Sequence, residues 1–92
     1  MMPEVSRFFG ITITLYYEKG THQRPHFHAR FGEYRASFTI DPPALLAGAM
    51  PRRQQHLVLA WAELHQEELL ANWDRAVQEE TLHRIKGLDQ EV

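Results

Sequence analysis

The stretch RPHFHARFGEYRASFTI, residues Arg24–Ile40, reads as two strands joined by a tight turn. Apolar and polar residues alternate on both sides of Gly32 and Glu33, which is the period of a half-buried strand. A glycine at the first position of a two-residue loop suits a type II′ turn. The sequence therefore predicts an antiparallel hairpin, with one strand from about His26 and the next from Tyr34.

The position of the turn fixes which residues face each other across this hairpin. The predicted pairs are Phe31 with Tyr34, Arg30 with Arg35, Ala29 with Ala36, His28 with Ser37, and Phe27 with Phe38. Like charges directly opposite each other are destabilising, on a scale of about 0.2 to 1 kcal/mol. We therefore expect the two arginines to have an anionic neighbour, whether Glu33, the acidic second half of the chain, a partner carboxylate or a phosphate.

The segments on either side of the hairpin also carry strand and loop signals. Phe8–Tyr17 alternates cleanly and predicts a single half-buried strand, with Phe9 on the apolar face and Phe8 on the polar face. Glu18–Pro25 is polar and contains glycine and proline, so it predicts a loop. Downstream, a proline-bounded connector contains a short edge strand at Ala44–Ala47.

Apolar residues recur at helical spacing over Arg52–Val77. At 100° per residue, the apolar stripe that contains Trp61 and the stripe that contains Trp73 point in directions about 110° apart. One straight helix would not aim both stripes at a single core. We therefore expect two helices, or a marked bend, near His65–Glu67.

The last part of the chain completes a single domain. Thr81–Lys86 fits a final short strand, and residues 87–92 form a tail that is expected to fray. A chain of 92 residues, 43% of them hydrophobic, is long enough for one modest core. We expect one α+β domain over residues 1–92, with an ordered core of about 4–86, in which two helices cover one face of a small antiparallel sheet of three or four strands.

Composition excludes several classes of function. The net charge of −2 argues against a general electrostatic grip on nucleic acid, because such domains are usually strongly basic. The charge is unevenly distributed, with five basic and three acidic side chains in residues 1–40 and five basic and nine acidic in residues 41–92. The absence of cysteine excludes disulfides, cysteine nucleophiles and thiolate metal sites. Without a long apolar run or a signal pattern, we expect a cytoplasmic protein that does not enter a membrane.

Three blocks of the sequence carry a family resemblance: MPEVSRFFGITITLYY from Met2, RPHFHARFGEYRASFTI from Arg24, and WAELHQEELLANWDRA from Trp61. Together they resemble the small bacterial proteins catalogued as domain of unknown function 4160, over Met2 to about Leu88. The resemblance implies a compact α+β domain in a bacterial cytoplasm and no assigned activity. It also implies a gene that sits beside another small gene, in an arrangement similar to toxin and antitoxin pairs. Two segments depart from the family pattern, namely the longer first loop with His22 and the connector DPPALLAGAMP.

The spacing of the histidines raises the question of a metal site. His26 and His28 are two residues apart on a predicted strand, so they point the same way, as two zinc ligands from one strand do. His22 in the adjoining loop would supply a third ligand. No carboxylate lies on the same strand face, and a polar exposed face with incidental histidines explains the pattern better than a metal site does. We predict no cofactor and keep zinc at His22, His26 and His28 as the alternative.

Acid–base catalysis is a second interpretation of the same face. Histidine titrates near neutrality, so His26 and His28 are the candidate catalytic residues. With Arg30 and Arg35 holding a phosphodiester, they would suit a metal-free ribonuclease. These residue types also occur together on a sheet face without catalysis, so an enzyme remains the alternative.

The interpretation that we favour is a binding face without enzymatic activity. Arginine and tyrosine are over-represented at interface hot spots, and aromatic and basic residues on a sheet suit stacking on unpaired RNA bases. We expect a small interaction module, one component of a toxin–antitoxin-like pair, that binds a protein partner encoded nearby or RNA; a homodimer is also compatible with the pattern. The predicted binding residues are Tyr16, His26, His28, Arg30, Arg35 and Ser37.

Overall fold

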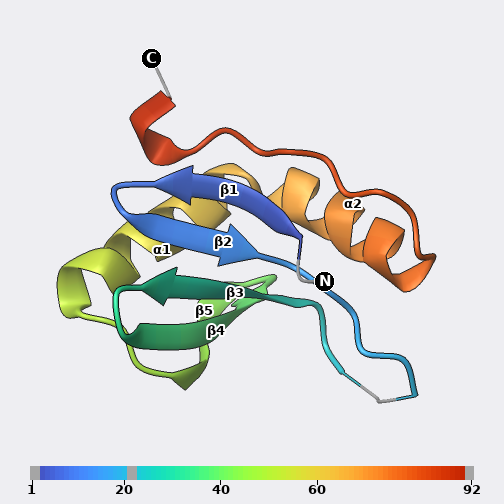
Figure 1. Ribbon diagram of the computed structural model, residues 1–92, viewed down its shortest axis with the longest axis horizontal. Helices are drawn as coiled ribbons and strands as arrows, with labels where there is room; N and C mark the ends of the chain where they lie inside the picture. Colours follow the sequence, from blue (N-terminus) through green and yellow to red (C-terminus); the bar gives the residue numbers. More distant parts are fainter. Residues whose placement is uncertain (1–2, 21–22, 91–92) are drawn as a thin grey trace.

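The computed structural model describes residues 3–20 and 23–90 and has an α+β fold, as predicted. The elements are β1 Glu4–Phe8, β2 Ile11–Thr14, β3 His26–Phe31, β4 Tyr34–Ile40, β5 Pro43–Gly48, α1 Arg52–Leu64, α2 Gln66–Val77 and the short 3₁₀ helix η1 Leu88–Gln90. Within the described residues the strands form one antiparallel sheet in chain order, β1 to β5 (Figure 1). The sheet therefore has five strands rather than the predicted three or four. No helix in the described ranges is long and apolar enough to cross a membrane.

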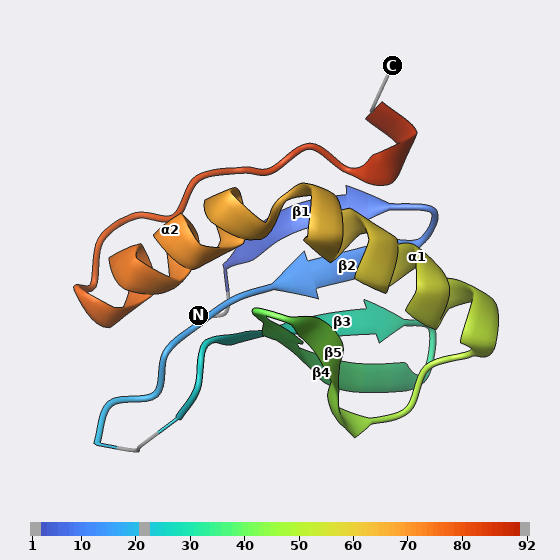
Figure 2. The same cartoon turned by 180° about the vertical axis from the view of Figure 1, so that it is seen from behind.

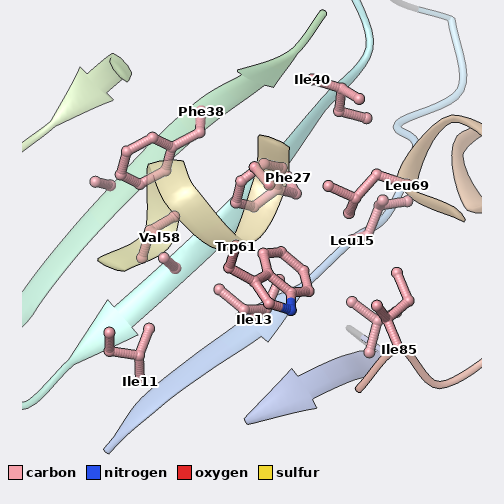
Figure 3. Close-up of a cluster of buried hydrophobic side chains, with 14 of the residues drawn as sticks. Ile11, Ile13, Leu15, Phe27, Phe38, Ile40, Val58, Trp61, Leu69 and Ile85 are labelled. Atoms are coloured by element: carbon pink, nitrogen blue, oxygen red, sulfur yellow. The ribbon is translucent and has the colours of Figure 1, made fainter. Parts of the chain in front are cut away.

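Both helices lie against one face of the sheet (Figure 2). The core between the layers is built around Phe27 of β3, Phe38 of β4 and Trp61 of α1, all of which are fully buried (Figure 3). Phe27 stacks on Phe38 with ring centroids 5.5 Å apart and meets Trp61 edge-on at 5.7 Å. The indole N–H of Trp61 donates to the backbone oxygen of Lys86 at 2.8 Å, which satisfies the one polar group of that ring. Burying each such side chain stabilises the fold by about 1.5 to 3 kcal/mol.

The register of β3 and β4 is the one predicted from the turn, for all five predicted pairs. Gly32 has a φ of 57°, and Glu33 has a negative φ, which is the combination that a type II′ turn requires. Because side chains alternate between the two faces of a strand, Phe27 lies in the core and Arg35 is exposed on the opposite face.

The prediction of one strand over Phe8–Tyr17 is wrong. The chain instead reverses at Phe9 and Gly10, which join β1 to β2 and have φ values of 49° and 77°. Two positive φ values are typical of a type I′ turn, where asparagine, aspartate or glycine is usual and phenylalanine is not. The reversal also exchanges the predicted faces, since Phe8 is 1% exposed and Phe9 is 52% exposed.

The two helices are separated where the sequence predicts a break. His65 has φ −119° and ψ 28°, so it lies outside helical geometry between α1 and α2. The break lets Trp61 of α1 and Leu69 of α2 enter the same core, and both are fully buried. The predicted edge strand at Ala44–Ala47 is also present, as the centre of β5.

The predicted final strand at Thr81–Lys86 is not formed. The segment is extended and lies beside β1, but its backbone bond to that strand is from the N–H of Ile85 to the oxygen of Val5, at 2.8 Å (Figure 1). Asn72 of α2 occupies the neighbouring backbone groups, since its side chain donates to the oxygen of His83 and accepts from the N–H of His83, both at 2.9 Å. A buried asparagine therefore replaces the strand ladder that the sequence pattern suggested.

The described part of the C-terminal tail is attached to the β1–β2 turn. The N–H of Phe9 donates to Oδ2 of Asp89 at 3.4 Å, and the N–H of Gly87 donates to Oε1 of Gln90 at 2.9 Å. A β-carbon on Gly87 would lie 2.7 Å from the backbone oxygen of Arg7, so the segment approaches β1 too closely for a larger residue.

The left-handed conformation of Phe9 yields a stability prediction. Phe9→Asn should raise the free energy of unfolding by about 1 kcal/mol, because asparagine adopts positive φ at lower cost and favours type I′ turns. Urea unfolding measures the change. Phe9→Ala is the matched control, since it removes the same half-exposed ring and keeps the unfavourable backbone. Equal stability of the two variants would contradict a strained turn.

Candidate functional site

The face of the sheet opposite the helices contains a hollow with a volume of about 530 Å³. We call this surface the open face and define it by Thr12, Thr14, Tyr16, His28, Arg30, Arg35 and Ser37. The short threonine and serine side chains lie between the longer tyrosine, histidine and arginine side chains, which leaves the hollow between them. Ala47 and Gly48 of β5 complete one side of the hollow, and Glu4 of β1 contributes from the other edge of the sheet.

Five of the six predicted binding residues line this hollow, and His26 does not. His26 is the first residue of β3, at the end of the sheet where α2 passes. Its ring lies 5.2 Å from Trp73 of α2 and 5.1 Å from His28. Pure strand alternation places His26 in the hollow beside His28, but the contact with Trp73 holds it at the end of the sheet instead.

Arg30 and Arg35 face each other directly across β3 and β4, and both side chains are exposed. In the part of the chain that the structure describes, neither guanidinium forms an ion pair, including with Glu33 in the adjoining turn. The anionic neighbour that the sequence leads us to expect is therefore not supplied by the described residues.

Glu4 brings a carboxylate to the hollow, but basic side chains already engage it. Its two oxygens accept from Arg7 at 2.7 Å and from Arg84 at 2.9 Å. The hydrogen bond from Arg84, and then that from Arg7, hold the pKa of Glu4 below its ordinary value. Glu4 was not expected here because β1 was not predicted; the register of β1 shifts between Glu4 and Ser6, so Val5 and Ser6 are both buried and no clean alternation marks the strand.

His28 lies in the wall of the hollow under an aromatic cover. Its ring stacks on Tyr16 with centroids 4.6 Å apart and planes within 6°. Nε2 of His28 is buried and has no hydrogen-bond partner. Burial lowers the pKa of His28, the neighbouring His26 lowers it further, and Glu18 acts in the opposite direction. The ring is therefore held in its neutral form at neutral pH.

The two histidines are placed differently with respect to the hollow. Nε2 of His28 is buried, so that nitrogen does not reach a molecule in the hollow. Nδ1 of His26 donates to the backbone oxygen of Arg24 at 2.9 Å, which leaves the lone pair of the neutral ring on Nε2. His26 lies outside the hollow that the paired arginines line.

The described residues also offer no complete metal site. Within residues 3–20 and 23–90 there is no group of three or more histidine, aspartate or glutamate side chains that could hold a metal ion. His22, the third predicted zinc ligand, lies outside the described residues. The rings of His26 and His28 meet edge to face at 72°, which is an aromatic packing contact.

Trp73, His26, His28 and Tyr16 form a continuous row of rings from α2 to the hollow. Successive centroids along this row are 5.2, 5.1 and 4.6 Å apart. The edge of Trp73 also meets Tyr17 at 5.5 Å, which attaches the β2 side of the sheet to the same helix. The segment after β2 that carries Tyr16 and Tyr17 is therefore attached to α2 through packed rings.

Residues 10–74 match the family model described as Domain of unknown function (DUF4160). The chain belongs to this family. The DUF4160 match begins at the β1–β2 turn and continues into α2, so it includes the open-face residues of β2, β3 and β4. No curated protein and no solved structure matches the chain. Since the family description gives no activity, the function of this DUF4160 domain has to be argued from its open face.

The lowered pKa of His28 predicts how the stability of this DUF4160 domain depends on pH. The unfolded ring takes up a proton near its ordinary pKa of about 6.5, whereas the folded ring does so only at lower pH. Stability is therefore unaffected by His28 above that pH, falls as the pH drops below it, and levels off below the folded pKa.

His28→Phe should flatten this loss, because it keeps the ring stack on Tyr16 and removes the titrating group. The melting temperature is measured between pH 8 and pH 5, and its slope against pH is compared between the variant and the parent. Ser37→Ala is the control, since it alters the same face without removing a titrating group. A slope that is the same for all three proteins would contradict the lowered pKa.

Proposed function

We propose that this protein is a small bacterial binding module, not an enzyme, whose open face holds a negatively charged segment of a protein partner. The partner would be the product of a neighbouring gene in the cytoplasm, as in a toxin and antitoxin pair. The observation that carries the proposal is the Arg30 and Arg35 pair, which lines the hollow without an ion pair in the described residues.

The arrangement of the two arginines favours an anionic partner on energetic grounds. Their mutual repulsion is relieved when an anion docks between them. A guanidinium also offers a fork of donors that matches a carboxylate in a two-point contact. Both side chains are exposed in the free protein, so they are available to a partner without a rearrangement of the core.

The remaining groups of the open face suit recognition rather than chemistry. Thr12, Thr14 and Ser37 provide hydroxyl groups that donate to carboxylate or carbonyl oxygens. His28 is neutral, buried at Nε2 and held by Tyr16, so it acts as a rigid wall. A rigid face loses little conformational entropy when a partner binds.

Single-stranded RNA is the second candidate, and the Tyr16 and His28 stack favours it. Stacked aromatic rings beside arginine form a platform on which an unpaired base can extend the stack. The net charge of −2 weighs against RNA, because a nucleic-acid-binding domain gains most of its affinity from an excess of positive charge. We therefore place the protein partner first.

Arg35→Ala tests the proposal. The variant should keep the stability of the domain within about 0.5 kcal/mol, as a surface substitution does, and should weaken partner binding in a salt-dependent way. The tagged chain is expressed in its native host, the protein and RNA that co-purify are identified by mass spectrometry and sequencing, and affinity is then measured at two salt concentrations.

Lys86→Ala is the matched control, since it removes one exposed positive charge from the C-terminal segment at the opposite edge of the sheet. It should leave the affinity unchanged. Equal affinity of the parent and the Arg35 variant would rule out the open face as the binding site. If RNA rather than a protein co-purifies with the parent chain, and the Arg35 variant does not retain it, RNA binding becomes the favoured function.

His28→Phe separates binding from catalysis. Phenylalanine keeps the ring that stacks on Tyr16 but does not take up a proton, so a face that only recognises its partner should retain its affinity within about threefold. Turnover of single-stranded RNA is measured on the same samples. If the parent cleaves RNA and the phenylalanine variant binds it equally well without cleaving it, His28 is catalytic.

A further inference from the structure

We propose that the outer edge of β5 binds an extended acidic peptide segment as a sixth strand, with a carboxylate of that segment held by Arg35. The proposal rests on the proposed function for the charge of the partner and adds where and in what conformation it binds. Addition of a strand to an exposed sheet edge is an established mode of peptide recognition, in which backbone hydrogen bonds supply affinity.

The two edges of the sheet differ in how they are covered. The outer side of β1 is occupied by the C-terminal segment, through the bond from Ile85 to Val5 and the ion pair of Arg84 with Glu4 (Figure 1). On β5, no described strand pairs with the outer side, and every residue from Ala44 to Gly48 is exposed. The β5 edge therefore has backbone groups available for another strand.

The sequence of β5 lacks the usual protection of a sheet edge. Proteins usually place charged side chains, such as lysine, on an exposed edge strand to prevent pairing. The chain carries no charged side chain from Pro42 to Pro51. It also presents two leucines there, Leu45 with 40% and Leu46 with 45% of its surface exposed. Apolar side chains of an added strand would cover them.

The edge of β5 is continuous with the hollow. Ala47 lies opposite Ser37 of β4, and both residues line the hollow. Gly48 lies so close to β4 that a β-carbon would be 2.3 Å from the backbone oxygen of Arg35. Because alanine and glycine have little or no side chain, nothing on β5 stands between its outer edge and Arg35.

The distance from the edge to Arg35 suits a carboxylate on an added strand. The N–H of Ala49 donates to the backbone oxygen of Arg35 at 3.0 Å, which places Arg35 beside the end of β5. Neighbouring strands are about 4.8 Å apart, so a sixth strand would lie about 10 Å from β4. An arginine and a glutamate side chain together span that distance.

Charge decides between a foreign acidic segment and a second copy of this chain. In a β5 to β5 pairing between two copies, neither edge strand has a carboxylate, so Arg35 of each copy would remain without an anion. An acidic segment of another protein supplies both the strand and the anion. We therefore assign the edge to a heterologous partner.

The test is a selection of random twelve-residue peptides, displayed on phage, on the immobilised full-length protein. The enriched peptides should carry aspartate or glutamate at alternate positions and no proline in the central part. The best peptide is then synthesised and its affinity is measured for the parent, Arg35→Ala and Lys86→Ala. The Arg35 variant should bind at least about tenfold more weakly, or about 1.4 kcal/mol, and the Lys86 variant as well as the parent.

Amide hydrogen exchange locates the peptide. Binding should slow the exchange of residues 43–48, because an added strand accepts from the outward N–H groups of β5, and should leave β1 unchanged. A peptide of the same sequence with alternate backbone nitrogens methylated is the matched control. It keeps every side chain and loses the strand donors, so it should bind at least about tenfold more weakly.

The outcomes distinguish the two proposals. An acidic peptide that needs Arg35 but leaves the exchange of residues 43–48 unchanged would overturn the edge assignment and leave the open face standing. Failure of any acidic peptide to be enriched would overturn the edge assignment as well. A third outcome is that, without any peptide, the protection of β5 from exchange increases with protein concentration and sedimentation detects a dimer. That outcome would show that a second copy occupies the edge and would overturn the heterologous assignment.

Discussion

The two-residue turn at Gly32 is the constraint on which the rest of the molecule depends. It pins the register of β3 and β4, and the register decides which side chains of both strands enter the core. A slip of one residue would turn one strand over relative to the other, so either Phe27 would leave the core and Arg30 would enter it, or Phe38 would leave and Arg35 would enter. The glycine therefore determines the hydrophobic layer and the charged layer together.

Features that residue type signals in the local sequence were predictable, and features without such a signal or with a distant cause were not. The register of β3 and β4 follows from the alternation of apolar and polar residues on both sides of Gly32. The break at His65 follows from the different directions of the apolar stripes that contain Trp61 and Trp73. The β1 and β2 hairpin was missed because Phe9 adopts a conformation that its residue type does not signal. The missing final strand depends on Asn72, whose two bonds to His83 join residues eleven positions apart.

The residues of the candidate site likewise include some that the sequence predicted and some that it did not. Tyr16, His28, Arg30, Arg35 and Ser37 gather in one hollow because they share a face, and sharing a face requires only a period of two. His26 obeys the same period, yet a helix residue 47 positions later determines where its ring lies. The sides of the hollow formed by Glu4, Ala47 and Gly48 come from the outer strands of the sheet, whose order the sequence did not reveal.

The row of rings from Trp73 to Tyr16 has an optical consequence. Trp73 is one of two tryptophans, and its ring lies 5.2 Å from that of His26, whereas Trp61 lies 5.7 Å from the ring of His65, outside this row. Indole emission is sensitive to the charge and position of a neighbouring imidazole. A molecule that binds against Tyr16 would displace one end of this row of rings, and the fluorescent indole of Trp73 lies at the other end. The native chain thus contains its own label for occupancy of the hollow, readable without a dye or a tag.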